Sequence, residues 1–291
     1  MSDDKARHLF IFEGAKAEDK IFKKLEQNFL GRKHAIKCVY DAEVYQLYKQ
    51  LSTDDFALDI VNLLKERSPR IAEELKDYDR DSFAFIYLFF DYDGHSSLAD
   101  DGKIIELLDF FDNDTANGQM FISYPMVEAL RHYRDMESFR DLTVKCKRAN
   151  CPWLQECETV ESCLAEPHYK NFVSTDNRKS LSNINSYTFE VWKELIIAHL
   201  CKANYLVNGR FDMPEELISQ QTIFDRQLSG YISRRCPEVA VLSAFPLFIL
   251  DYFGVEKLMA RLFGEESDEL SEDPASQPDG GSGSDEYSVV E

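Results

Sequence analysis

Residues 85–95 have the sequence FIYLFFDYDGH, an apolar run that ends in two aspartates around a single tyrosine. Consecutive aromatic and branched residues predict a strand that is buried on both faces. In open α/β sheets, ligands bind just beyond the carboxyl ends of such strands. Asp91 and Asp93 therefore offer two carboxylates at a position suited to Mg²⁺ or Mn²⁺.

A second segment of this kind lies near the N-terminus, where HLFIF at residues 8–12 is followed by Glu13. Glu18 comes five residues later in a predicted helix, and Glu128 follows a short predicted strand at residues 120–123. Carboxylates gathered at one edge of a sheet repel one another unless cations bind between them. Two divalent ions there could activate a water on one side of a phosphodiester and stabilise the leaving oxygen on the other.

Strand and helix patterns alternate over the first 140 residues, which predicts a mostly parallel sheet covered by helices on both faces. We expect strands at residues 8–13, 36–40, 85–90 and 120–123. We expect helices at residues 17–30, 42–52, 55–66, 71–76 and 101–111, with a further helix that begins at Pro125. Proline is well suited to the first turn of a helix, because its missing N–H would have no partner there.

After about residue 140 the strand patterns fade, and long apolar helices are predicted at residues 187–207, 214–232 and 238–263. We therefore expect an α/β domain over residues 1–140 and a helical subdomain over residues 141–264, with a loosely defined boundary. Residues 265–291 contain ten acidic and no basic residues and predict a disordered acidic tail. The tail could keep the protein soluble, imitate nucleic acid over a basic groove or dock a partner, and the sequence leaves these three roles open.

Composition and charge limit the function classes. The chain has 291 residues and a formal net charge of −20, half of which lies in the tail, so it is poorly suited to hold a phosphate backbone on its own. No apolar stretch is long enough for a membrane helix, and the charged N-terminus does not resemble a signal peptide. We therefore expect a cytoplasmic protein with no membrane partner.

Four of the seven cysteines lie close together in the second half, and His168 follows them. Four thiolates could hold a structural Zn²⁺ or an iron–sulfur cluster. No Cys-x₂-Cys pair is present, however, and the spacing also suits buried thiols in a helical hairpin. These cysteines are Cys146, Cys151, Cys157 and Cys163.

Two further residues are candidates for the chemistry. Arg131, one turn beyond Glu128, could clamp a phosphate or stabilise the charge of the transition state, or could form an ordinary salt bridge. His95 could act as a general base or a metal ligand, or could simply hydrogen-bond the loop that follows Asp93.

These motifs together resemble the Toprim domain, in which a glutamate after the first strand and an Asp-x-Asp after a later strand bind Mg²⁺. Residues 11–18, IFEGAKAE, are similar to the Glu-Gly-x-x-x-Glu opening of OLD and RloB-like nucleases. Residues 91–95, DYDGH, resemble the Asp-x-Asp-x-His of the RloB-like branch, and residues 123–128, SYPMVE, resemble its Asn-Pro-x-x-Glu helix start, with Tyr124 in place of the usual asparagine. The resemblance covers roughly residues 8–133.

The resemblance implies a Mg²⁺-dependent endonuclease of an anti-phage defence (abortive infection) system, with Glu13, Asp91 and Asp93 as metal ligands and Glu18 and Glu128 as further ligands or neighbours. Its substrate would be DNA or an RNA such as tRNA, and a homodimer is compatible with it. Such proteins often act with an ABC-type ATPase, which must be a separate polypeptide because this chain has no phosphate-binding Gly-x-x-x-x-Gly-Lys-Ser/Thr loop. The alternative is a non-catalytic regulatory subunit with a Toprim-like core, which the net charge favours.

Overall fold

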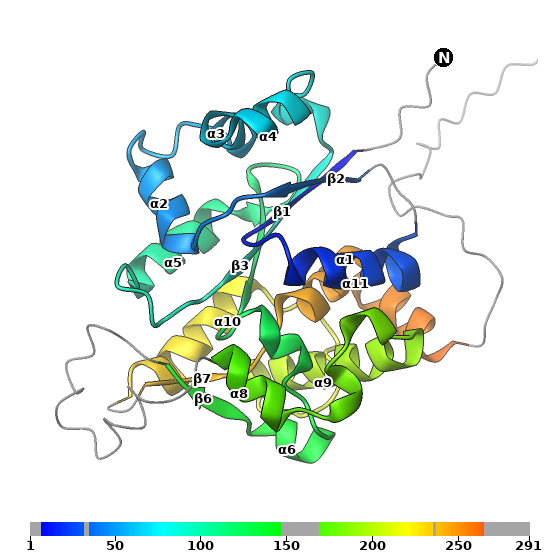
Figure 1. The fold of residues 1–291 in the computed structure, drawn as a ribbon. Helices are drawn as coiled ribbons and strands as arrows, with labels where there is room; N and C mark the ends of the chain where they lie inside the picture. Colours follow the sequence, from blue (N-terminus) through cyan, green and yellow to red (C-terminus); the bar gives the residue numbers. More distant parts are fainter. Residues whose placement is uncertain (1–6, 32–34, 147–168, 235–236, 265–291) are drawn as a thin grey trace, which may run out of the picture.

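The computed structural model describes residues 7–31, 35–146, 169–234 and 237–264 (Figure 1). The predicted acidic tail and three of the four clustered cysteines, Cys151, Cys157 and Cys163, lie outside these residues, as does His168.

A five-stranded sheet with the order β2-β1-β3-β5-β4 forms the centre of the first half (Figure 1). Four strands are parallel, and the two-residue β4 pairs antiparallel with β5. The strands are β1 His8–Phe12, β2 Ala35–Val39, β3 Phe85–Asp91, β4 Asp112–Asn113 and β5 Gly118–Ser123. The predicted mostly parallel α/β sheet is confirmed, and the four expected strands agree with the structure to within two residues at each end.

Aromatic side chains fill one face of the sheet. The strand register aligns Phe12 with Phe89 and Phe89 with Phe121, so their rings form a ladder with centroids 5.3 and 5.7 Å apart. Phe245 stacks on this ladder, 4.9 Å from Phe89. On the opposite face Tyr40 contacts Phe90. Because both faces of the central strands are buried, β1 and β3 are almost entirely apolar, whereas the edge strand β2 is partly exposed and carries Lys37.

Helices cover both faces, with α1 and α11 on one side and α2 to α5 on the other (Figure 1). The helices of the first half are α1 Ala17–Leu25, α2 Val44–Ser52, α3 Ile60–Arg67, α4 Pro69–Glu74 and α5 Asp101–Phe110. A π-helical turn, η1 Glu26–Leu30, extends α1, and a 3-10 turn, η2 Arg80–Ser82, precedes β3. The five helices expected between residues 17 and 111 are present, although α3 begins at Ile60 rather than at residue 55.

Helix α6 lies just before residue 141, and α8, α9, α10 and α11 lie after it, together with the shorter helical turns η4, η5 and η6. Their bounds are α6 Met136–Arg140, α8 Tyr169–Asp176, η4 Lys179–Leu181, η5 Ile184–Ser186, α9 Phe189–Asn208, α10 Gln220–Gln227, η6 Leu228–Ile232 and α11 Ala244–Phe263. The predicted helix at residues 214–232 begins only at Gln220, and the second half also contains strands that were not predicted, because β6 Thr143–Lys145 and β7 Glu238–Ala240 pair as an antiparallel ribbon. The helix predicted from residue 238 therefore begins only at Ala244.

The prediction of a helix beginning at Pro125 was also wrong. The Tyr124–Pro125 peptide is cis, and the chain stays extended to Met126 before the 3-10 helix η3 Val127–Arg131 begins. Two backbone hydrogen bonds between Tyr124 and Leu242 hold this segment as a short antiparallel bridge. Pairing with the second half thus prevents the local helix that the proline would otherwise favour.

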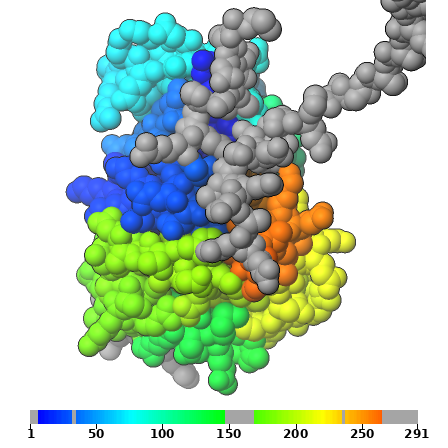
Figure 2. Space-filling model, turned by 90° about the vertical axis from the view of Figure 1, so that its right-hand side faces the viewer, coloured from blue at the N-terminus to red at the C-terminus, as the bar shows by residue number. Residues whose placement is uncertain are grey.

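The two halves share one hydrophobic core. Helix α11 packs on strands β3 and β5, and Phe29 stacks on Phe189 with centroids 5.2 Å apart. Helix α9 contacts α11, and Figure 2 shows the blue segment near the N-terminus lying directly on the yellow-green segment that includes α9. None of the helices within the described ranges has the length and apolar character needed to cross a membrane.

Gly118 provides a test of the sheet packing. Its φ is +123°, and an added Cβ would lie 2.8 Å from Leu88 Cδ1 and 3.1 Å from Ile86 Cγ2. Gly118→Ala should therefore lower the free energy of unfolding by about 1–3 kcal/mol, measured by chemical denaturation. Gly230→Ala is the matched control, because nothing lies within 4 Å of its added Cβ and its φ is not strained. Equal effects of the two substitutions would contradict this account of the packing.

Candidate metal centre

A hydrogen bond joins the carboxyl ends of β1 and β3. The Asp91 backbone N–H donates to Glu13 Oε2 at 3.0 Å, and the Glu13 N–H donates to the Phe89 carbonyl at 3.0 Å. Glu13 thus continues the pairing of the two strands by one residue and directs its carboxylate toward the end of β3. The structure brings together these two residues, which the sequence analysis paired as metal ligands.

Glu18 faces the same place from the first turn of α1. Its Oε1 accepts a hydrogen bond from the Gly14 N–H at 3.0 Å, and its side chain is buried. An added Cβ on Gly14 would lie 2.9 Å from that oxygen. A glycine after the first strand therefore allows the Glu18 carboxylate to fold back over the turn.

The loop that carries Asp93 is held by the neighbouring strand end. The Tyr92 N–H donates to the Ser123 carbonyl, and the Asp93 N–H donates to the Pro125 carbonyl at 3.2 Å. Asp93 has a φ of 45°, and its Oδ1 is buried without a hydrogen-bond partner. His95 is half exposed, and its Nδ1 lies 3.6 Å from that oxygen. An acceptor left unsatisfied in a buried position is consistent with a bound cation.

Glu128 approaches from η3 and is buried. Lys170, on α8, places its Nζ 3.4 Å from Glu128 Oε1 and keeps most of its own side chain exposed. The sequence analysis did not identify Lys170, because nothing local links it to the acidic motifs. It also missed Glu43, the residue before α2, whose charge acts on Glu13 and Asp93.

Burial and mutual repulsion raise the pKa values of these carboxyl groups. Desolvation and then the charge of Asp93 raise the pKa of Glu13 to about 9. Desolvation raises the pKa of Asp93 to about 6, and it raises the pKa of Asp91 well above its usual range, with the charge of Glu13 as the next cause. Desolvation also raises the pKa of Glu18. Protons or bound cations on the cluster therefore stabilise the folded protein at neutral pH.

The donor set suits a hard divalent cation, because it consists of carboxylate oxygens from several elements. Over the described part of the chain, however, no three acidic, histidine or cysteine side chains are already close enough to form an ion cage. An ion would have to draw the carboxylates inward from their present rotamers. The residues that could contribute are Glu13, Glu18, Asp91, Asp93 and Glu128.

Arg131 is half buried, and its charge lowers the pKa values of Tyr169 and Tyr187 against the raising effect of burial. The charges of Glu128 and Asp91 act on the same Tyr169 phenol, so Arg131 as a phosphate clamp stays a prediction. Lys170 contacts Glu128 directly.

Cys146 is buried against the loop that follows Asp93. An added Cβ on Gly94 would lie 2.1 Å from the Cys146 sulfur and 2.7 Å from Tyr92 Cε1. The β6 end of the helical half therefore supports the acidic loop directly. The predicted four-cysteine metal site, Cys146, Cys151, Cys157 and Cys163, extends beyond the described residues and stays a prediction.

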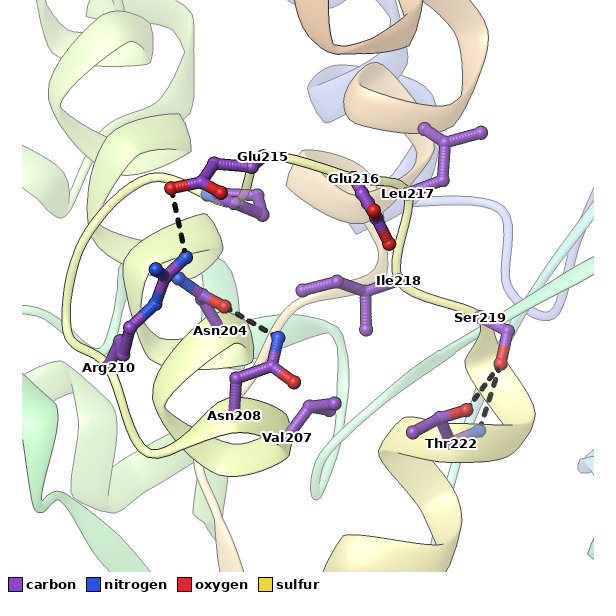
Figure 3. Close-up of a pocket in the computed structure, with 11 residues that line it drawn as sticks. Asn204, Val207, Asn208, Arg210, Glu215, Glu216, Leu217, Ile218, Ser219 and Thr222 are labelled. Carbon is purple, nitrogen blue, oxygen red and sulfur yellow. Dashed lines mark hydrogen bonds and ion pairs between the residues drawn. The ribbon is translucent and has the colours of Figure 1, made fainter.

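A separate hollow lies away from the carboxylate cluster. A cavity of about 350 Å³ opens between the end of α9 and the start of α10, and Asn204, Asn208, Arg210 and Glu215 line part of it (Figure 3). None of the candidate metal ligands lines this cavity. It offers no cluster of catalytic groups and does not compete with the carboxylate cluster as an active site.

Comparisons with protein-family models, with curated proteins and with solved structures each returned no match.

The raised pKa of Glu13 predicts a pH-dependent cost in stability. Between about pH 4.5 and 9 the folded protein keeps a proton on Glu13 that the unfolded chain releases, so stability falls as pH rises through this window. Glu13→Gln keeps an acceptor for the Asp91 N–H but cannot ionise. In EDTA we expect the melting temperature of Glu13→Gln to lie roughly 2–8 °C above that of wild type at pH 8. At pH 5 we expect a smaller difference.

Glu66→Gln is the matched control, because Glu66 is exposed on α3. Its melting temperature should follow that of wild type at both pH values. A constant difference between Glu13→Gln and wild type from pH 5 to pH 8 would show that Glu13 is not held in its neutral form.

Proposed function

We propose that this protein is a Toprim-like, Mg²⁺- or Mn²⁺-dependent nuclease that hydrolyses phosphodiester bonds in DNA or in an RNA such as tRNA. The observation that carries the proposal is the meeting of Glu13 with Asp91 at the ends of two adjacent parallel strands, with Asp93, Glu18 and Glu128 close enough for their charges to interact. Parallel strands that end in carboxylates at one sheet edge, between helical layers, suit the Toprim arrangement.

Each carboxylate would have a defined part in holding the cations. Glu13 and Asp91 would form the centre, Asp93 would contribute its unsatisfied oxygen, and Glu128 and Glu18 would complete the set. Bound divalent ions would supply Lewis-acid activation of water and would offset negative charge on the leaving oxygen. The carboxylates would orient the scissile phosphate through these ions, while the buried walls would limit access of bulk water.

The Lys170 ammonium would move from the Glu128 carboxylate to a phosphate of the substrate. In the structure it lies next to Glu128, and its exposed stem leaves the ammonium free to move. Once cations neutralise Glu128, a nearby phosphate becomes the stronger attraction for this ammonium. Lys170 would then neutralise charge on the phosphate, the part that the sequence analysis assigned to Arg131.

We further propose that the nuclease acts in anti-phage defence under the control of a separate ATPase. Two features of the chain support a partner: it lacks a phosphate-binding loop, and its net charge of −20 opposes tight binding of nucleic acid by this chain alone. A partner with a basic surface would supply the missing affinity.

Cleavage of plasmid, linear DNA and total tRNA tests the proposal. With Mn²⁺ we expect wild type to cleave at least one of these, and we expect Glu13→Gln and Asp91→Asn each to reduce the rate by about 100-fold or more. Glu66→Gln and Asp77→Asn alter exposed acids of the same types and should leave the rate unchanged. Cleavage that survives both Glu13→Gln and Asp91→Asn would reject the site.

Metal binding should be coupled to proton release. Because Glu13 and Asp91 retain protons in the ion-free protein, Mn²⁺ must displace them, and its affinity should rise with pH. Calorimetry in buffers of different ionisation enthalpy should detect release of about one to two protons at pH 7. Binding of Mn²⁺ without cleavage of any nucleic acid would favour the regulatory-subunit alternative, and absence of Mn²⁺ binding would contradict the proposal.

A further inference from the structure

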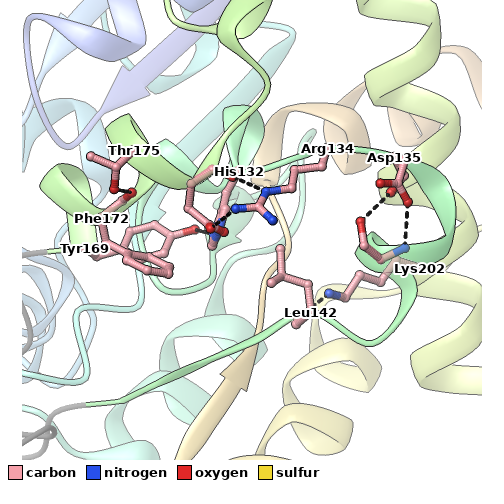
Figure 4. Close-up of polar contacts among 10 residues, drawn as sticks. His132, Arg134, Asp135, Leu142, Tyr169, Phe172, Thr175 and Lys202 are labelled. Atoms are coloured by element: carbon pink, nitrogen blue, oxygen red, sulfur yellow. Dashed lines mark hydrogen bonds and ion pairs between the residues drawn. The ribbon is translucent and has the colours of Figure 1, made fainter.

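Three polar side chains form a continuous chain beside the carboxylate cluster. His132 Nδ1 lies 2.9 Å from the Tyr169 hydroxyl, and His132 Nε2 lies 3.0 Å from Asp176 Oδ2 (Figure 4). His132 follows η3 directly and is 1% exposed, so it is sealed from solvent. Tyr169 and Asp176 stand seven residues apart on α8, which places them on the same face of that helix.

The surroundings determine where the protons of this chain lie. Burial lowers the pKa of His132, and the imidazole is therefore neutral near pH 7. Arg134 donates to both the backbone carbonyl and the side chain of Asp176, which holds that carboxylate in place. Asp176 then accepts the Nε2–H of His132, and Nδ1 is left to accept the hydroxyl proton of Tyr169.

The chain ends at the candidate active site. The residue after Tyr169 is Lys170, which contacts Glu128, and α8 packs against the η3 turn that carries Glu128. Burial and then the charge of Glu128 raise the pKa of the Tyr169 phenol, and the charge of Asp91 adds to this. The hydroxyl therefore lies within electrostatic reach of two candidate ligands, with its proton directed away from them toward His132.

This arrangement matches a general base with an orienting partner. Both ring nitrogens of a buried histidine need partners, so it is the identity of the partners that suggests a role. Here both ring nitrogens are used, one toward a fixed carboxylate and one toward a hydroxyl beside the acidic cluster. The phenol oxygen keeps acceptor capacity on the side away from His132.

We propose that Tyr169 is a further catalytic residue, which accepts the proton of the attacking water and passes its own proton to His132. The inference rests on the proposed nuclease function. The water oxygen forms a bond to phosphorus while one water O–H bond breaks. That proton joins the Tyr169 oxygen, and the tyrosine proton moves to His132 Nδ1, where Asp176 stabilises the imidazolium. The bond from phosphorus to the leaving oxygen breaks, and the leaving oxygen takes a proton from solvent.

Substitutions at both ends of the relay test the proposal. Tyr169→Phe and His132→Ala should each lower kcat by about 100-fold or more, while Mn²⁺ affinity measured by calorimetry stays within about threefold of wild type. Tyr133→Phe is the matched control, because it removes a neighbouring phenol whose hydroxyl bonds Glu194 at 3.0 Å instead. Its kcat should remain that of wild type.

Two measurements separate proton transfer from a purely structural role. Imidazole added to His132→Ala should restore activity at least 10-fold more than pyrazole, which has the same shape but is a much weaker base. In the metal-free wild-type protein, ¹⁵N NMR should show His132 as the neutral Nε2–H tautomer, and Tyr169→Phe should shift its Nδ1 resonance. If imidazole gives no such rescue, or if NMR does not show this tautomer and shift, Tyr169, His132 and Asp176 have a structural role only.

The outcomes also distinguish this inference from the proposed function. Cleavage that depends on Glu13 but survives Tyr169→Phe would overturn the relay and leave the nuclease intact. A denaturation-resistant adduct between Tyr169 and a labelled oligonucleotide would also overturn it, because the tyrosine would then be a nucleophile. Wild type that binds Mn²⁺ but cleaves no nucleic acid would reject the nuclease and the relay together.

Discussion

The hydrogen bond from the Asp91 N–H to the Glu13 carboxylate joins two strand ends that are 78 residues apart in the chain. It places a second buried acid beside Asp91, and the charges of Asp93, Glu18 and Glu128 act on the same carboxyl group. Such a cluster is unfavourable in a buried, apolar environment unless protons or cations neutralise it. The proposed function rests on this constraint, since a cluster of carboxylates that needs neutralising charge is suited to bind divalent cations.

The aromatic core explains how the protein tolerates this cluster. Phe12, Phe89 and Phe121 interlock along the sheet, and Phe245 covers them from α11. The packing fixes the backbone at the strand ends, so the acids can change their separation only through their side-chain rotamers. Strain at the sheet edge is offset by packing a few residues away, as is common at functional sites.

The helical half belongs to the site as well as to the core. It supplies Lys170 beside Glu128, the relay of Tyr169 and Asp176 around His132, and the Cys146 side chain beneath the acidic loop. None of these residues forms a motif with the acids of the first half. Contact between the halves thus adds a cation, Lys170, and the proposed base, Tyr169, to the acids of the first half.

The positions of the parallel strands along the chain and the acids that follow them were predictable from residues 8–128, because a buried strand followed by a carboxylate is a local pattern, whereas the order of the strands in the sheet was not predicted. The pairing of Glu13 with Asp91 also follows, since parallel strands end at the same edge. The conformation at Pro125, the β6–β7 ribbon, and the positions of Lys170 and Tyr169 depend on contacts between distant segments. Local propensity does not encode such contacts, and packing of the second half on the first decided them.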